Sequence, residues 1–566
     1  MNLRDLDVSG LAAAFATRTE SGRAALLARL EEPLTEESAV AGRRAEIRGI
    51  RERCKDAAVT ARIAAARAVL SETEADCLSV ADAATDKRHA EYYNQLLWGP
   101  DSWFAWLNRL GWVNEAILFF RTVFVPGTAV LLPVIVFLAP LILTRLFAGP
   151  DAPPLTFDRY VELVTGAFKK MMPAGMGKAR FAGRGGFLEM GEQMVHLGVA
   201  GAMFVASIWN QVSAALTMRG VAADMRHRAA SVRRAAAAVR DLAAALGVEL
   251  TGSVAADPGW GSSDLGAFGE AWNEPERVRL ILAEAGRLDM LAAVALTKRT
   301  CFARTGATLR LTDLYHPALS STDRVYNSIE MDPAAAATDA SGAPRQHVLL
   351  TGPNRGGKST FLKSLGAAIL LNQTVGVVFA RRAELPVFGS IVTALSPADR
   401  LGEMSLFEAE IEFAKGVRET IREASKPVFL MMDEIFHGTN AHDGVEASQV
   451  FLDELYHGGN AAAPVFSVVS THYMDLPTRY GGKKTQNLCM DASVDPADPD
   501  QLIYTYRLCP GVNRFSSVRE ILRERGLLTA TKERGLLTAT VVKNAEQKDD
   551  AVCGSPAQKT SAPAAE

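Results

Sequence analysis

The stretch from Thr351 to Thr360, TGPNRGGKST, has residue types and spacing that suit the binding of a phosphate chain. It follows the apolar run His347–Leu350 and precedes Phe361–Leu371, whose apolar positions recur at helical spacing. A strand, a glycine loop and a helix form the context of a phosphate-binding loop. The loop amides and the helix N-terminus present positive partial charge to an anion. The alternative interpretation is a glycine-rich turn that carries a solvated lysine.

Each part of this loop has an expected role. Glycines let the backbone curl tightly and approach the phosphates. The lysine is expected to reach the β- and γ-phosphates of ATP, and the serine after it to ligate Mg²⁺ through its hydroxyl. The predicted nucleotide-binding residues are Gly352, Pro353, Asn354, Arg355, Gly356, Gly357, Lys358, Ser359 and Thr360.

A second stretch, Lys426–Glu434, is an apolar run that ends in two carboxylates. We expect it to form a strand beside the loop strand in a parallel sheet, which delivers both acids to the nucleotide. Asp433 is then expected to hold Mg²⁺. Glu434 is expected to orient or deprotonate the attacking water, because phosphoryl transfer needs a positioned nucleophile. The alternative is an acidic strand end that caps the next segment.

The loop sequence resembles the nucleotide-binding loop of the MutS family, which belongs to the ABC-type ATPases. Four further segments resemble the family in its order along the chain. They are Ser405–Glu410 (SLFEAE), Asp433–Asn440 (DEIFHGTN), Ser470–Tyr473 (STHY) and Tyr506–Ser516 (YRLCPGVNRFS). The resemblance covers about residues 275–528, under half of the chain.

The resemblance implies an α/β P-loop NTPase domain that hydrolyses ATP with Mg²⁺ as a conformational switch. It implies a homodimer, or a heterodimer with another MutS-like chain, in which Ser405 completes the partner's site. It further implies that Tyr326 packs on the adenine and that His472 senses the γ-phosphate as a third catalytic residue beside Lys358 and Glu434. His472 could equally be a structural histidine. DNA binding and mismatch repair are implied by the family alone.

Two features depart from the family's pattern. The turn that contains His437 lacks the arginine usual in mismatch-repair members and looks more like divergent, membrane-linked ones. Phe268-Gly-Glu270 resembles the family's mismatch-stacking motif, but it lies too close to the loop for that domain, and we interpret it as a surface turn. We therefore expect the mismatch-recognition domain to be lacking.

Composition limits the partners. The net charge of −3 gives no global basic field that would attract nucleic acid. The six cysteines form no C-x-x-C pair, and this pattern argues against a zinc site and for a reducing compartment. Five arginines cluster between Arg43 and Arg53. They could touch phosphates or anionic lipid, but interleaved acids favour a solvated helix face.

Two uncharged runs suggest a membrane. Residues 122–144 hold 14 Leu, Ile, Val or Phe among 23 positions, which is long enough to span a bilayer. Residues 195–218 form a weaker second run. Four of the seven tryptophans lie just before the first run, as at a membrane boundary or in an aromatic core. The alternatives are a buried hairpin for the first run and a buried alanine-rich helix for the second.

The predicted organisation has five parts: a helical region (1–91), a membrane region (92–218), a helical connector (219–305), the ATPase domain (306–528), and a tail (529–566) that begins inside a nine-residue repeat. The fold class is an ABC-type α/β domain after a mainly α-helical half with one or two transmembrane helices. We expect a membrane protein whose ATPase domain faces the cytosol. The rival hypotheses are a membrane-associated ABC-type ATPase and a nucleotide-gated scaffold, neither with a role on DNA.

Overall fold

The computed structural model describes residues 3–83, 91–132, 187–251, 263–334, 345–395, 405–457, 463–482, 485–498 and 501–527, with isolated positions between them. The chain divides into two compact units. One contains Met1–Ala61 with Gly286–Glu566, and the other is Arg62–Ala285. The predicted tail, 529–566, and all but the start of the repeat lie outside the described residues.

A six-stranded sheet forms the centre of the first unit. Its strand order is β10-β9-β4-β8-β7-β6, and every neighbouring pair is parallel except β10 with β9. Every residue of β4, β7 and β8 is buried, as expected of parallel strands that are covered on both faces. The strands are β4 (His347–Thr351), β6 (Ser390–Ala394), β7 (Val428–Met432), β8 (Val465–Ser470), β9 (Thr485–Val494) and β10 (Leu502–Pro510).

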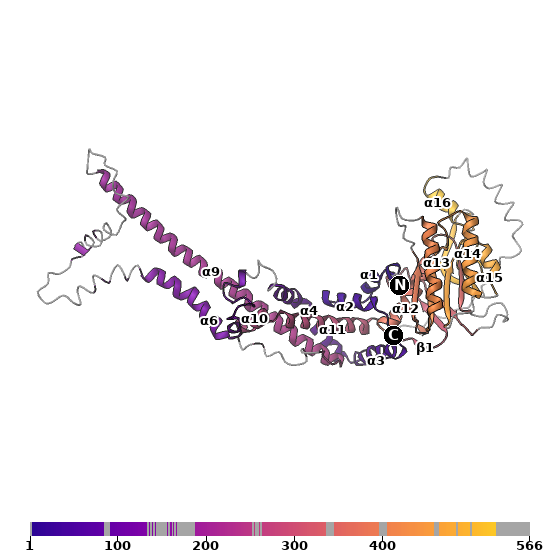
Figure 1. Ribbon diagram of the computed structural model, residues 1–566, viewed down its shortest axis with the longest axis horizontal. Coiled ribbons are helices and arrows are strands. Elements are labelled where there is room, and N and C mark those ends of the chain that lie inside the picture. Colours follow the sequence, from indigo (N-terminus) through magenta and orange to yellow (C-terminus); the bar gives the residue numbers. More distant parts are fainter. Residues whose placement is uncertain are drawn as a thin grey trace. The chain divides into compact units, whose positions relative to one another are not determined.

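Helices accompany this sheet (Figure 1). The helix predicted after the glycine loop is α12 (Lys358–Thr374), and it is buried along almost its whole length. The amphipathic α13 (Leu406–Glu423) instead buries only Ala414 and Val417 fully. The remaining helices are α14 (Ala441–His457), α15 (Asp475–Tyr480) and α16 (Val518–Glu524).

A smaller mixed sheet belongs to the same unit, with the order β1-β5-β2-β3. Its strands are β1 (Arg304–Thr305), β2 (Leu309–Leu314), β3 (Asn327–Met331) and β5 (Arg382–Leu385). Only β1 and β5 are parallel. The C-terminal half is therefore an α/β fold with mixed sheets, in agreement with the predicted class.

The first 61 residues belong to the unit that contains both sheets, although they lie far from them in sequence. Leu34 N donates to Gln373 O (2.8 Å), and the side-chain amide of Gln373 donates back to Leu34 O (2.9 Å). The carboxylate of Asp5 accepts from Thr393 Oγ1 (3.0 Å) at the end of β6. The elements are η1 (Leu3–Leu6), α1 (Val8–Ala13), α2 (Glu20–Glu31) and α3 (Glu37–Arg53).

The arginine cluster of α3 bonds to the protein itself. Arg44 donates to Ala303 O and Thr305 Oγ1. Arg51 donates to Ala295 O (3.2 Å), a carbonyl of the last turn of α11 (Pro275–Leu296), and to Thr300 Oγ1 (2.8 Å). The expectation of a solvated face is therefore wrong for these two: Arg51 satisfies a carbonyl that the end of α11 leaves open, and Arg44 bonds to β1 and to the residue before it.

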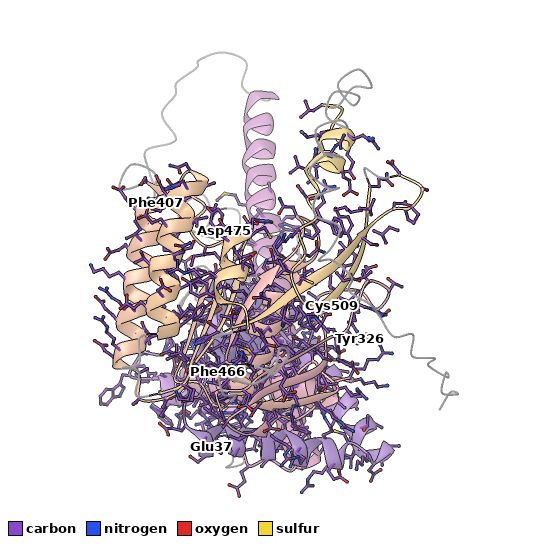
Figure 2. The ribbon with its side chains drawn as sticks, turned by 90° about the vertical axis from the view of Figure 1, so that its right-hand side faces the viewer. Glu37, Tyr326, Phe407, Phe466, Asp475 and Cys509 are labelled. Carbon is purple, nitrogen blue, oxygen red and sulfur yellow. The ribbon has the colours of Figure 1, made fainter. Side chains whose placement is uncertain are left out.

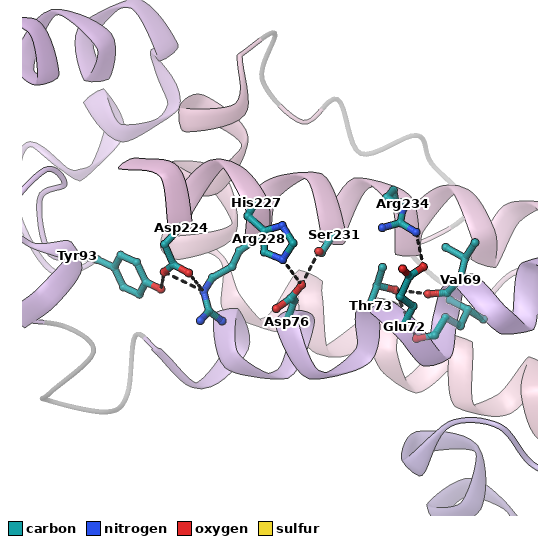
Figure 3. Close-up of polar contacts among 11 residues, drawn as sticks. Val69, Glu72, Thr73, Asp76, Tyr93, Asp224, His227, Arg228, Ser231 and Arg234 are labelled. Carbon is teal, nitrogen blue, oxygen red and sulfur yellow. Dashed lines mark hydrogen bonds and ion pairs between the residues drawn. The ribbon is translucent and has the colours of Figure 1, made fainter. Parts of the chain in front are cut away.

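The second unit is helical. Its longest helix, α9 (Phe187–Leu246), packs beside α4 (Ala57–Ala83), whose first turn belongs to the other unit. Figure 3 shows the polar contacts that connect α9 with α4 and Tyr93: Tyr93 with Asp224, His227 and Ser231 with Asp76, and Arg234 with Glu72. The other helices are η2 (Ala105–Arg109), α6 (Gly111–Phe119), η3 (Phe120–Phe124), α10 (Asp264–Asn273) and the first half of α11 (Pro275–Leu296), which from Gly286 on belongs to the first unit.

Phe268 lies in α10 and is completely buried, so the prediction of a surface turn is wrong. Its ring packs 4.9 Å from that of Tyr93 and 6.5 Å from that of Trp272. The Ser263 side chain accepts from Gly266 N and so caps the start of α10, and a serine at this place is a local signal for a helix rather than a turn. In this position the phenylalanine presents no exposed ring to a base.

One helix among the described residues, Gly111–Leu132, is long and apolar enough to cross a membrane by length and composition. This helix begins before the predicted span, 122–144, and overlaps its first half. Most of residues 133–144 lie outside the described residues. The second predicted span lies within α9, which does not meet the same measure of apolarity.

The role of α2 in the first unit can be tested at Asp289, a fully buried carboxylate of α11. It accepts from Arg18 N (2.8 Å), Thr19 N (3.0 Å) and Thr19 Oγ1 (3.0 Å). Asp289→Ala removes the acceptor of both donors of the buried residue Thr19, so we expect a loss of about 1–3 kcal/mol for each unsatisfied group. Denaturant unfolding measures it. Glu31→Ala, an exposed carboxylate of α2, is the control, and an equal effect of both substitutions would contradict this role.

Candidate nucleotide-binding site

Three neighbouring strands end at one edge of the six-stranded sheet. β4 leads into the glycine loop, β7 into Asp433 and Glu434, and β8 into His472. We predicted that β7 lies directly beside β4, but β8 stands between them. All three strands are parallel, so their carboxyl ends still meet, and the end of β8 reaches both neighbours.

The glycine loop curls as its sequence predicts. Gly357, the residue before α12, has φ 94°, a conformation that other residues rarely adopt. A Cβ placed there would also lie 3.1 Å from Tyr506 Cδ1. Gly352 has φ 151°, and a Cβ there would lie 3.1 Å from Met490 Cβ. Both positions therefore favour glycine for their backbone conformation, and a side chain at either would press on its neighbour.

Lys358 lies inside the curl of the loop, with 5% of its surface exposed. Its Nζ donates to the carbonyls of Gly352 (3.0 Å) and Pro353 (3.3 Å). Burial lowers the pKa of this ammonium, while the nearby charges of Glu434 and Asp433 act in the opposite direction. A cation with so little water around it favours an anion strongly, because charge interactions strengthen as water is excluded.

Ser359 and Asp433 form a pair of oxygen groups beside the loop. Ser359 Oγ donates to Asp433 Oδ2 (2.5 Å), and Ser470 Oγ, at the end of β8, donates to Asp433 Oδ1. A hydroxyl and a carboxylate in contact are the ligands that Mg²⁺ takes from a protein when phosphates and water supply the rest. These residues fit the metal that the sequence implies. Among the described residues, no cluster of three or more His, Cys, Asp or Glu forms a metal site.

Glu434 is held in place by the end of β8. His472 Nε2 lies 2.8 Å from Glu434 Oε1 and 3.3 Å from Lys358 Nζ. Glu434 N donates to Ser470 Oγ (3.0 Å). The hydrogen bond from His472 lowers the pKa of the Glu434 carboxyl, which partial burial alone would raise. Glu434 is therefore a carboxylate at neutral pH, the form that accepts a proton.

The turn after β7 contains two residues in the left-handed region, Glu434 (φ 56°) and Phe436 (φ 51°). Such conformations cost roughly 1–3 kcal/mol each and persist where surrounding contacts enforce them. Besides the bond from Glu434 N to Ser470, the hydroxyl of Tyr473 donates to Phe436 O (2.9 Å). His437 Nδ1 lies 2.9 Å from Glu434 O.

Other predicted residues lie at the surface or away from this cluster. Asn354, Arg355 and Thr360 are exposed, and Arg355 pairs with Glu524. Tyr326 is 46% exposed, with its ring 5.5 Å from that of Tyr315.

Ser405 caps α13, with its Oγ accepting from Glu408 N (3.3 Å) in a capping box. In Figure 2, Phe407 in the first turn of α13 lies well apart from Tyr326.

Four residues of this region had no assigned role from the sequence. Ser470 bonds to both Asp433 and Glu434, and the ring of Tyr506 lies against Gly357. Glu410 and His437 hold the turn after β7. Position at the last residue of a buried strand could have indicated Ser470, whereas the others become neighbours only through tertiary folding.

The fold and the site define a P-loop nucleotide-binding domain of the ATPase class. Residues 348–547 match the family model of MutS domain V, which covers the glycine loop and both carboxylates. The C-terminal half of the chain is therefore MutS-like, as predicted, and the chain is a partial MutS-like protein.

Similar proteins support this assignment over part of their length. The DNA mismatch repair protein MutS of Thermus thermophilus is 31% identical over 260 residues, which are 46% of this chain and 29% of the relative. That of Bacillus subtilis is 36% identical over 136 residues, 24% of this chain and 15% of the relative. That of an Exiguobacterium species is 34% identical over 133 residues, 23% of this chain and 15% of the relative.

Lys358→Met tests the site by binding alone. The substitution keeps the length of the side chain and removes the buried cation that faces the loop. We expect the affinity for Mg²⁺-ATP to fall by about 2–5 kcal/mol, roughly 30-fold or more. Titration with a fluorescent ATP analogue measures it, and Lys363→Met, on the same helix, is the matched control. Unchanged affinity in Lys358→Met would contradict the assignment.

Proposed function

We propose that the protein hydrolyses ATP with Mg²⁺ and uses the nucleotide state as a conformational switch. The observation that carries this proposal is the connected set of side chains at the strand ends. Lys358, Glu434 and His472 contact one another in a chain, and Ser359 contacts Asp433 beside them. Phosphoryl transfer depends on such positioning and charge rather than on covalent chemistry.

Each residue has a proposed part in the reaction. Lys358 and the loop amides bind the β- and γ-phosphates, and Ser359 and Asp433 hold the metal, which neutralises phosphate charge when bound. Glu434 orients the attacking water and accepts its proton. His472 donates to Glu434 and lies beside Lys358, so it is placed to respond to the γ-phosphate.

We propose that the active form is a dimer. Ser405 is exposed at the N-terminus of α13, which its capping box with Glu408 holds in place. This placement supports the expectation, implied by the MutS resemblance, that the serine reaches the nucleotide of a partner subunit. Tyr326 and Tyr506 are the exposed rings proposed to lie near the nucleotide.

DNA binding is proposed from the relatives, which are named DNA mismatch repair proteins. A net charge of −3 requires any DNA contact to be local. Phe268 is buried in α10 and does not support mismatch stacking at this position.

We propose membrane anchoring through the helices around residues 111–132 and 201–218. Large apolar side chains project outward on both: Phe120 (52% exposed) and Leu131 (58%) on one, Val205 (64%) and Trp209 (70%) on the other. The two helices lie side by side, since Arg226 pairs with Glu115 at 2.9 Å and η3 packs on α9. Paired helices with apolar outer surfaces suit lipid, and the ATPase unit is then cytosolic.

Hydrolysis and its coupling to DNA are tested together on the full-length protein in detergent. We expect Glu434→Gln to reduce kcat by about 10²–10⁴-fold, the usual contribution of a general base, while ATP binding persists. Wild-type hydrolysis is measured without DNA and with duplex, mismatched and branched DNA. We expect one DNA form to stimulate the wild type several-fold and to leave Glu434→Gln unchanged.

The other outcomes favour the rival functions. Hydrolysis that responds to lipid but to no DNA would support a membrane-associated ABC-type ATPase. Tight ATP binding without hydrolysis would support a nucleotide-gated scaffold.

Alkaline extraction of membranes tests the anchor. We expect the wild-type protein to stay in the membrane pellet. The double variant Leu131→Arg, Val205→Arg should shift to the supernatant, because each arginine within a membrane helix costs about 2.5–3.5 kcal/mol. Leu280→Arg replaces a leucine outside the two helices that is 48% exposed, and it should leave the pellet unchanged. Wild-type protein in the supernatant would contradict anchoring.

A further inference from the structure

A carboxylate on α13 contacts the turn that follows β7. Glu410 Oε1 accepts from His437 N (3.3 Å), and its Oε2 accepts from Gly438 N (3.1 Å). His437 Nδ1 also lies 2.9 Å from Glu410 Oε1. We call these three residues the Glu410 clasp. Only 10% of the Glu410 side chain is exposed, so water competes little for these bonds.

The clasp holds the turn against the helix by shape as well as by charge. A Cβ on Gly438 would lie 2.8 Å from Phe407 N and 2.9 Å from Leu406 Cγ, both in the first turn of α13. The absence of a side chain at position 438 therefore allows the backbone of the turn to lie directly on the helix. A displacement of α13 must move this turn or break its bonds to Glu410.

The clasp is connected to Glu434 through the backbone of the turn and through the side chain of His437. His437 Nδ1, besides facing Glu410, lies 2.9 Å from Glu434 O. Glu434 and Phe436 both have left-handed backbone, which requires contacts to maintain it. Ser470 and Tyr473 hold the turn from the side of β8, and the Glu410 clasp holds it from the opposite, α13 side.

We infer that Glu410 is a positioning residue for Glu434, and that the clasp couples the orientation of Glu434 to the position of α13. This inference rests on the proposed hydrolysis. Because Ser405 caps the same helix, a movement of α13 on contact with a partner subunit changes the carboxylate that orients water in its own subunit. Nucleotide binding itself depends on Lys358 and Ser359, which the clasp does not touch.

The test compares Glu410→Gln with Glu412→Gln in the full-length protein. A glutamine at 410 keeps the shape but has one oxygen for two backbone donors, and its NH₂ group faces a donor. We expect kcat to fall about tenfold to 100-fold, as for a small displacement of a catalytic group, with the affinity for the ATP analogue unchanged within twofold. Glu412 is 63% exposed and pairs with Lys415 in the same helix, so Glu412→Gln should retain wild-type kcat.

Two further variants separate positioning from general stability. Gly438→Ala pushes the turn from α13 without changing a charge, and it should lower kcat in the same way. His437→Ala combined with Glu410→Gln should lower kcat by less than the product of the two single effects, because both act through one contact.

Wild-type kcat in both Glu410→Gln and Gly438→Ala would overturn the inference and leave the proposed function intact. Equal losses of kcat and of nucleotide affinity would also overturn it, since they indicate a merely structural role. Wild-type hydrolysis no faster than that of Glu434→Gln would instead refute the proposed function and the inference with it.

Discussion

The positions of Asp433 and Glu434 in the site depend on the hydrogen bonds of the Ser470 hydroxyl. It lies at the end of β8, fully buried, and bonds to the carboxylate of Asp433 and to the backbone N–H of Glu434. Because β8 separates β4 from β7, this one hydroxyl joins the metal-binding side of the site to the turn that carries the proposed base. His472, two residues further along, extends the same strand end to Lys358. A parallel sheet makes this possible because its strands end together.

The turn after β7 combines strain with restraint. Two residues with left-handed backbone are maintained by bonds from β8 on one side and from α13 on the other. A turn fixed from two directions has few alternative positions. A displacement of β8 or α13 therefore moves the turn as well, whereas a freely hinged loop would not follow it. The site thus contains a physical route between the helix capped by Ser405 and the carboxylate of Glu434.

The side chains of α9 have different surroundings in its two halves. In its C-terminal half, charged and polar side chains pair with α4, as Figure 3 shows for Asp76 with Ser231 and His227. Between Gly201 and Met218, the side chains of α9 are uncharged and mostly exposed. The change from paired polar groups to exposed apolar ones within one continuous helix is the physical basis for proposing a lipid environment at one end only.

The sequence by itself determined the loop, its helix and the roles expected of Lys358, Ser359, Asp433 and Glu434. These follow from local signals, since a glycine loop between an apolar run and a helical pattern has few other conformations. The motifs also established the MutS resemblance, which the family match bears out. Local patterns gave the wrong prediction at Phe268. Whether this phenylalanine lies in a turn or in a core depends on its packing against Tyr93, which is distant in sequence, and Trp272, which is one helical turn away.

Only the tertiary structure decided which residues meet. Strand order is not encoded in any one segment, so the placement of β8 between β4 and β7 could not be read from the chain. The clasp joins Glu410 to Gly438, and the hydrogen bonds of Gln373 join α12 to Leu34 near the N-terminus. Such contacts arise when helices and strands pack to bury apolar surface, and that packing is a property of the whole unit rather than of its parts.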